Sequence, residues 1–99
     1  MKLTKLIDEV NEVLTFRWDP IGVSNMSSRE IALTEYRSYA KGIAKMLRAN
    51  VAEYKVREYL TMLRTKHIGM PADDDADIEI VRMLMDLKTS GPASRRTRP

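Results

Sequence analysis

Residues 3–20 read LTKLIDEVNEVLTFRWDP, and this stretch decides the class of fold. Its apolar side chains recur at the three- and four-residue spacing of a single helix face: Leu3, Leu6, Ile7, Val10, Val13 and Leu14. The pattern predicts an amphipathic helix from about residue 3 to residue 17. Pro20 ends this helix, because a proline disfavours the α conformation in the residue before it. The chain therefore begins with a helix that has one face to bury.

A second helix is expected after a loop over about residues 21–33. This helix should cover 34–49, with Thr34 as its N-cap, since a threonine side chain there can accept a hydrogen bond from a free backbone N–H. Ser27 and Glu30 have the spacing of a capping box, and an earlier helix start is therefore the alternative. The hydroxyl-rich composition of the preceding segment favours the loop.

The second half of the chain predicts two further helices. Asn50 suits the left-handed residue that closes a helix, and the next helix should cover about 52–67. Ala52 would be a poor cap for that helix, so its first turn should fray. The fourth helix should start in the acidic run at 73–77, where negative charge favours a helix N-terminus, and end near Lys88.

The composition agrees with one helical domain. The chain has 99 residues, of which 43% are hydrophobic and 31% charged, as in an ordinary globular domain. We predict an all-α fold: a compact four-helix domain over residues 1–88, with a long loop between helices one and two. Residues 89–99 have no periodicity and are expected to be a disordered basic tail.

Cysteine is absent from the chain, which excludes disulfides and zinc sites built on thiolates. No apolar run approaches the length of about 18 residues that crosses a bilayer, and the first residues do not resemble a signal peptide. The sequence therefore predicts a cytoplasmic protein that does not insert into a membrane.

The charge is unevenly distributed. Residues 21–70 hold nine basic and four acidic side chains, whereas residues 71–88 hold two basic and six acidic ones. The formal net charge of +3 equals the contribution of Arg95, Arg96 and Arg98 in the tail. The predicted domain is thus neutral but dipolar, and its high pI alone does not indicate nucleic-acid binding.

Three short motifs carry a family resemblance: WDPIGV at 18–23, EYRSY at 35–39 and HIG at 67–69. Over roughly residues 6–88 the chain resembles a group of small bacterial helical proteins with a Trp-Asp-Pro-Ile-Gly turn. It is more distantly similar to the YugE-like proteins of bacilli, which share the Trp-Asp-Pro turn. The resemblance implies a helical fold and no particular activity. The chain departs from the group at Ala52, where members tend to carry serine.

The turn after helix one allows two interpretations. In the first, Trp18 closes over the end of the core with Ile21 and Val23, while Gly22 supplies a positive φ. In the second, Trp18 and Asp19 are exposed and bind a partner. A structural role is the expected one.

No catalytic, metal or cofactor site is predicted. Four acidic residues follow the spacing of the first ligands of a calcium-binding EF-hand loop: Asp73, Asp75, Asp77 and Glu79. The loop would have Ile78 in place of its glycine and Leu84 in place of its closing glutamate, so calcium binding is not expected. His67 is the single histidine, and we expect it either to cap carbonyls at the end of its helix or to be hydrogen-bonded at the edge of the core. The sequence indicates neither an enzyme nor a small-molecule substrate.

A basic strip is expected along helix two. It consists of four residues at spacings of three and four: Arg37, Lys41, Lys45 and Arg48. Such a strip is usually solvated surface, but it could also bind an acidic protein partner or phosphates.

Helix four is apolar over most of its circumference. Ile78, Val81 and Met85 share one side of it, and we expect this side to contact another chain, either a second copy or a different protein. Burial of the same side within the bundle is the alternative. Together with the basic strip, this predicts a protein-binding module, of the kind found in inhibitors and immunity proteins. The alternative function is a nucleic-acid-binding accessory protein that uses the strip and the arginine tail.

Overall fold

The structure is a computed structural model and describes residues 2–20, 22 and 29–89. Within these ranges it consists of α-helices and two π-helical turns, and it has no strand. The helices are α1 (Leu3–Val13), α2 (Arg29–Glu35), α3 (Arg37–Arg48), α4 (Glu53–Met62) and α5 (Asp74–Thr89). The π-helical turns are η1 (Leu14–Trp18), which continues α1, and η3 (Leu63–His67), which continues α4. The prediction of an all-α fold is confirmed.

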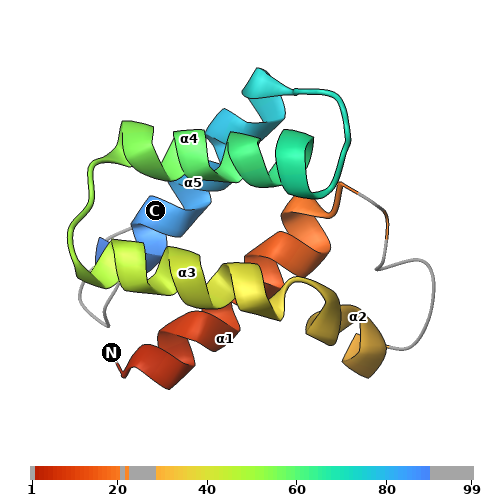
Figure 1. Ribbon diagram of the computed structural model, residues 1–99. Helices are drawn as coiled ribbons and strands as arrows, with labels where there is room; N and C mark the ends of the chain where they lie inside the picture. Colours follow the sequence, from red (N-terminus) through yellow and green to blue (C-terminus); the bar gives the residue numbers. More distant parts are fainter. Residues whose placement is uncertain (1, 21, 23–28, 90–99) are drawn as a thin grey trace, which may run out of the picture.

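The helices form two crossed pairs. Figure 1 shows α1 crossing behind α3 and α5 crossing behind α4. Helix α1 also packs against α5, so one apolar core is shared by all four of these helices. Its fully buried members include side chains from each of them: Val10, Ile43, Leu60 and Leu84.

Helices α1 and α4 end in the same way. In each case a backbone N–H reaches back five residues, from Asp19 to the Leu14 carbonyl at 2.8 Å and from Ile68 to the Leu63 carbonyl at 2.9 Å. Such wide turns are rare and occur mostly as single turns at helix ends or in functional regions. Here they carry the ends of the first and third predicted helices towards each other. Both predicted helices are confirmed.

The second predicted helix differs from the expectation. The chain is already helical from Arg29, so the expected loop over 21–33 is shorter, and Thr34 lies within α2 instead of capping a helix. A break at Tyr36, with φ −102° and ψ 7°, separates α2 from α3. At this break the Asn11 side-chain amide donates a hydrogen bond of 2.6 Å to the Leu33 carbonyl. The described residues therefore hold five α-helices and not four.

Several local predictions are confirmed. Asn50 has a left-handed conformation with φ +58°, and Gly22 has φ +74°. Ala52 is the N-cap of α4 and makes no side-chain cap hydrogen bond, while the fraying of the first turn stays a prediction. Helix α5 begins in the acidic run, where the Asp73 carboxylate accepts a hydrogen bond of 3.1 Å from the Ala76 N–H.

The predicted tail after Thr89 lies outside the described residues. Among the helices that the structure describes, none has both the length and the apolar character needed to cross a membrane.

Candidate protein-binding surface

A buried polar cluster joins the ends of three helices. Its centre is Asp77 in the first turns of α5, which is 0% exposed. The Arg64 guanidinium lies beside it, with Nη2 at 2.8 Å and Nε at 3.1 Å from Asp77 Oδ1. Two further donors complete the cluster: Trp18 Nε1–H at 2.9 Å from Oδ1, and the Thr61 hydroxyl at 3.1 Å from Oδ2. A buried carboxylate is tolerated only when it is paired and hydrogen-bonded in this way.

The two π-helical turns supply two of the three side chains that donate to Asp77, and Thr61 of α4 is the third. Trp18 is the last residue of η1, and Arg64 is the second residue of η3. The Arg64 guanidinium carbon also lies 5.7 Å from the centre of the Trp18 ring, which is within the range of a cation–π contact. The cluster thus ties helices α1, α4 and α5 together. Because Arg64 is 8% exposed, the cluster is a structural element of the interior.

The Trp-Asp-Pro turn takes part in the same interior network. Trp18 is 7% exposed, so the alternative in which Trp18 is exposed is wrong. Its ring meets the Tyr36 ring edge-on with centroids 5.6 Å apart, and the Tyr36 hydroxyl donates a hydrogen bond of 3.0 Å to Asp19 Oδ1. Asp19 holds a left-handed conformation with φ +37°. Ile21 and Val23, the expected neighbours of Trp18, lie outside the described residues.

Sequence reasoning missed Arg64 and Asp77. The sequence places Asp77 in the acidic run that favours the start of its helix, yet Asp77 shares a face with Ile80 and Leu84. Arg64 likewise follows the buried positions of Leu60 and Leu63. A charged residue on each of two apolar helix faces is the signal that could have revealed the ion pair.

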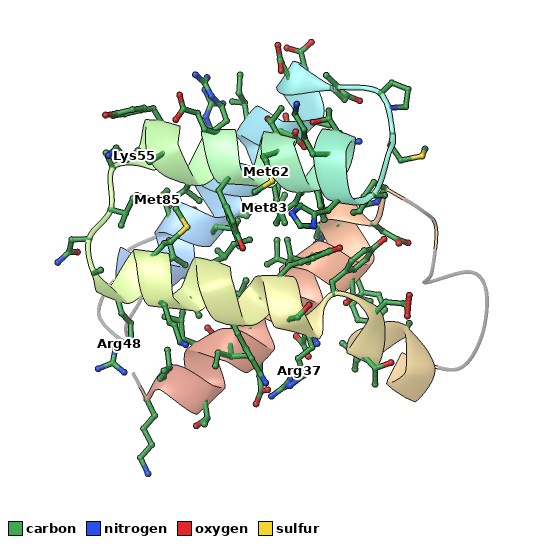
Figure 2. The ribbon with its side chains drawn as sticks, viewed as in Figure 1. Arg37, Arg48, Lys55, Met62, Met83 and Met85 are labelled. Atoms are coloured by element: carbon green, nitrogen blue, oxygen red, sulfur yellow. The ribbon has the colours of Figure 1, made fainter. Side chains whose placement is uncertain are left out.

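The basic strip lies on α3 as predicted. Lys41, Lys45 and Arg48 are exposed, and none of them pairs with an acidic residue that the structure describes. Arg37 is different, because its guanidinium forms an ion pair of 2.9 Å with Asp8 of α1. In Figure 2, Arg37 and Arg48 extend from the side of α3 that faces away from α4. The strip is therefore a surface of three cations that have no acidic partner among the described residues, with a fourth, paired one at its end.

An apolar seam lies on the other side of α3. Four half-buried side chains belong to it: Tyr39 and Met46 from α3, and Tyr59 and Met62 from α4. Figure 2 places Met62 on the side of α4 that faces α3. A Cβ atom built at Gly42 would lie 2.8 Å from the Tyr59 hydroxyl oxygen, so Tyr59 reaches across the seam to the backbone of α3. We refer to these four residues as the seam.

The predicted contact side of α5 is partly core. Val81 is 1% exposed and packs within the bundle, so its prediction as a surface residue is wrong. The reason is that α5 lies between α1 and α4, and Val81 is on the side that faces α4. Ile78 and Met85 are half-buried beside it. Ile78 lines a shallow pocket with Tyr54 and Arg57 of α4, and Tyr54 is 54% exposed.

The remaining candidates for a reactive or metal site are His67 and the acidic residues at 73–79. His67 is exposed and meets the Tyr39 ring edge-on, with centroids 6.3 Å apart. In the part of the chain that the structure describes, no three acidic or histidine side chains come close enough to hold a metal ion.

Comparison with protein-family models, with curated proteins and with solved structures returned no match. The resemblance to small bacterial proteins with a Trp-Asp-Pro-Ile-Gly turn stays a prediction from the sequence.

Proposed function

We propose that this chain is a protein-binding module that binds an acidic surface of its partner through α3. The observation that carries the proposal is the basic strip: Lys41, Lys45 and Arg48 are exposed along one helix and have no acidic partner among the described residues. Complementary charges across an interface speed association and select the partner. An inhibitor or immunity-type protein, which covers an acidic surface of another protein, uses such a face.

The residues of the seam favour a protein as the partner of α3 over a nucleic acid. Tyrosine, methionine and arginine are enriched at protein interfaces, and methionine adapts its shape at little cost. Tyr39 and Met46 of the seam lie on the same helix as the strip, on its other side, so a partner that covers α3 can contact apolar area as well as the cations. Nucleic acid is the second candidate, because three cations at helical spacing can also contact successive phosphates.

Site-specific photo-crosslinking tests the proposal. The chain has no cysteine, so Ser38→Cys places a single crosslinker on the exposed side of α3, near Lys41 and Lys45. Thr4→Cys on the exposed side of α1 is the matched control. We expect the α3 variant, and not the α1 variant, to crosslink in cells to one acidic protein after nuclease treatment. Equal labelling from both positions would refute the proposed face, and a product lost on nuclease treatment would favour the nucleic-acid function.

A further inference from the structure

A small hollow in the surface lies between α4 and α5. It is lined by Glu53, Tyr54 and Arg57 of α4 and by Ile78 and Val81 of α5. Its volume is about 90 Å³, whereas pockets that bind small molecules usually measure about 300–1,000 Å³. The hollow therefore suits a side chain of another protein molecule better than a small-molecule ligand.

An exposed aromatic ring stands at the edge of this hollow. Tyr54 is 54% exposed, which is more than the other exposed large apolar side chains that the structure describes, Phe16 and Met70 at 38% each. Beside it, Ile78 is half-buried and Val81 belongs to the core, so the hollow has an apolar floor. Tyrosine is enriched at protein interfaces, because its ring buries a large area while its hydroxyl keeps a hydrogen bond. The face thus has a ring to bury and a place in which a ring can be buried.

Two opposite charges line the same hollow. Glu53 and Arg57 are exposed and lie four residues apart on α4, the spacing at which opposite charges are neighbours on a helix. In the part of the chain that the structure describes, the side chains of both residues lack an ionic or hydrogen-bonding partner. The face therefore presents an anion and a cation side by side, and both are available to another molecule.

This pair of charges is complementary to a copy of itself. In a dimer with two-fold symmetry both chains use the same surface, so every contact between two different residues occurs twice with the roles exchanged. When two α4 helices meet antiparallel, Glu53 of each copy faces Arg57 of the other, and both attractive pairs form at once. A partner surface of uniform charge would meet one attractive and one repulsive group. The charges therefore favour a second copy of the chain.

We propose that a second copy of this chain covers the hollow in a two-fold symmetric dimer. In this dimer α4 packs antiparallel against α4, Glu53 pairs with Arg57 across the interface, and Tyr54 of each copy lies over the hollow of the other. We expect a weak dimer with a dissociation constant of about 10–100 µM, because one helix face and one hollow make a small interface.

The dimer leaves the basic strips free. Arg37 and Arg48 extend from the side of α3 that faces away from α4 (Figure 2), whereas the dimer contact is made by α4 and α5. Each dimer therefore presents two strips, which strengthens binding to a partner that carries two acidic sites. The proposal is independent of the function proposed for α3, since the two surfaces share no residue.

Sedimentation equilibrium of the full chain, from below to above the expected dissociation constant, tests the proposal. We expect the wild type to pass from monomer to dimer as the concentration rises. Arg57→Glu alone and Glu53→Arg alone each place like charges opposite each other twice, and each should weaken the dimer by about tenfold or more. Glu53 lies in the first turn of α4, where a cation is unfavourable, so circular dichroism checks that each variant is folded.

A mixture of the two single variants separates this dimer from any other contact. The Glu53→Arg chain has two cations at the interface and the Arg57→Glu chain has two acids, so both pairs are attractive between unlike chains. We expect the equimolar mixture to dimerise although neither variant does so alone. The double swap, Glu53→Arg with Arg57→Glu, should dimerise by itself. A mixture that stays monomeric would overturn the proposed pairing.

Matched controls test the remaining parts of the interface. Lys55→Glu and Glu79→Arg reverse exposed charges outside the hollow and should leave the association unchanged. Tyr54→Ser removes the ring and should weaken the dimer by about tenfold or more, as expected for a central interface tyrosine. A wild type that is monomeric at every concentration would overturn the proposal, as would a dimer that survives both single reversals. A dimer lost on removing the charges of the strip would assign the contact to α3 and also overturn it.

Discussion

The buried cluster and the strip on α3 use positive charge in opposite ways. Arg64 is 8% exposed and directs its guanidinium into the carboxylate of Asp77. Lys41, Lys45 and Arg48 are exposed and contact no acidic residue that the structure describes. A buried charge must have its partner for the chain to fold, whereas an exposed one contributes little to stability and is available to another molecule. Substitutions in the two regions should therefore separate folding from binding.

The largest effect is expected when the buried pair is broken. Asp77→Ala leaves the Arg64 guanidinium buried without its counter-charge, which should lower the free energy of unfolding by about 3–5 kcal/mol. Urea denaturation followed by circular dichroism measures the loss. Asp75→Ala, an exposed acid in the same helical turn, is the control and should cost less than about 1 kcal/mol. Equal losses in the two variants would show that the cluster does not stabilise the fold.

A smaller loss should follow when one donor to the cluster is removed. Trp18→Phe keeps an aromatic ring between the helices but removes the Nε1–H that donates to Asp77. Hydrogen bonds to charged groups contribute about 1.5–3 kcal/mol, and we expect a loss in that range in the same urea assay. Thr61→Val removes the other neutral donor with little change of shape and is a useful comparison. A Trp18→Phe variant as stable as the wild type would show that this hydrogen bond is replaced by another donor.

Two opposed contributions to the free energy of unfolding meet at Gly42, beside the seam. Gly42→Ala improves the helix propensity of α3 by about 1 kcal/mol, but the new Cβ meets the Tyr59 hydroxyl. We expect the full gain only together with Tyr59→Phe, and a smaller gain in the wild-type background. A double-mutant cycle in urea measures the coupling between the two positions. Additive effects would mean that Tyr59 moves aside without cost.

The smallest effect on stability is expected for the strip. Lys41→Gln, Lys45→Gln and Arg48→Gln together remove three exposed charges and no buried contact. At physiological ionic strength the free energy of unfolding should fall by about 1 kcal/mol or less, because Lys45 and Arg48 lie in the last turn of α3, where a cation favours the helix C-terminus only weakly. Thermal and urea unfolding measure it. A loss as large as that of Asp77→Ala would place the strip among the elements that hold the fold.

Local sequence signals predicted much of the fold. The apolar period of residues 3–14, the left-handed Asn50 and the acidic start of α5 each depend on neighbours in the sequence, and each is confirmed. The break at Tyr36 could not be predicted, because it depends on contacts with Trp18 and Asp19 that lie far away in the chain.

The exposure of the basic strip could be predicted from the sequence, but the burial of Val81 and the Arg64–Asp77 pair could not. The spacing of the strip places its residues on one side of a helix, so their exposure followed from sequence. Val81 was misplaced because a helix that is apolar around most of its circumference does not show which side faces its neighbours. The pairing of Arg64 with Asp77 depends on how α4 and α5 pack, and a single sequence carries only the hint that both charges lie on apolar faces.

The most direct test of the account is the dissociation constant of the complex with the protein that crosslinks to α3. Calorimetry would compare the wild type, the Lys41→Gln, Lys45→Gln, Arg48→Gln variant and a control that loses three exposed cations elsewhere: Lys2→Gln, Lys5→Gln and Arg82→Gln. The account predicts that the α3 variant stays folded and binds at least about tenfold more weakly, while the control stays within about twofold of the wild type. A folded α3 variant that binds as tightly as the wild type would contradict it.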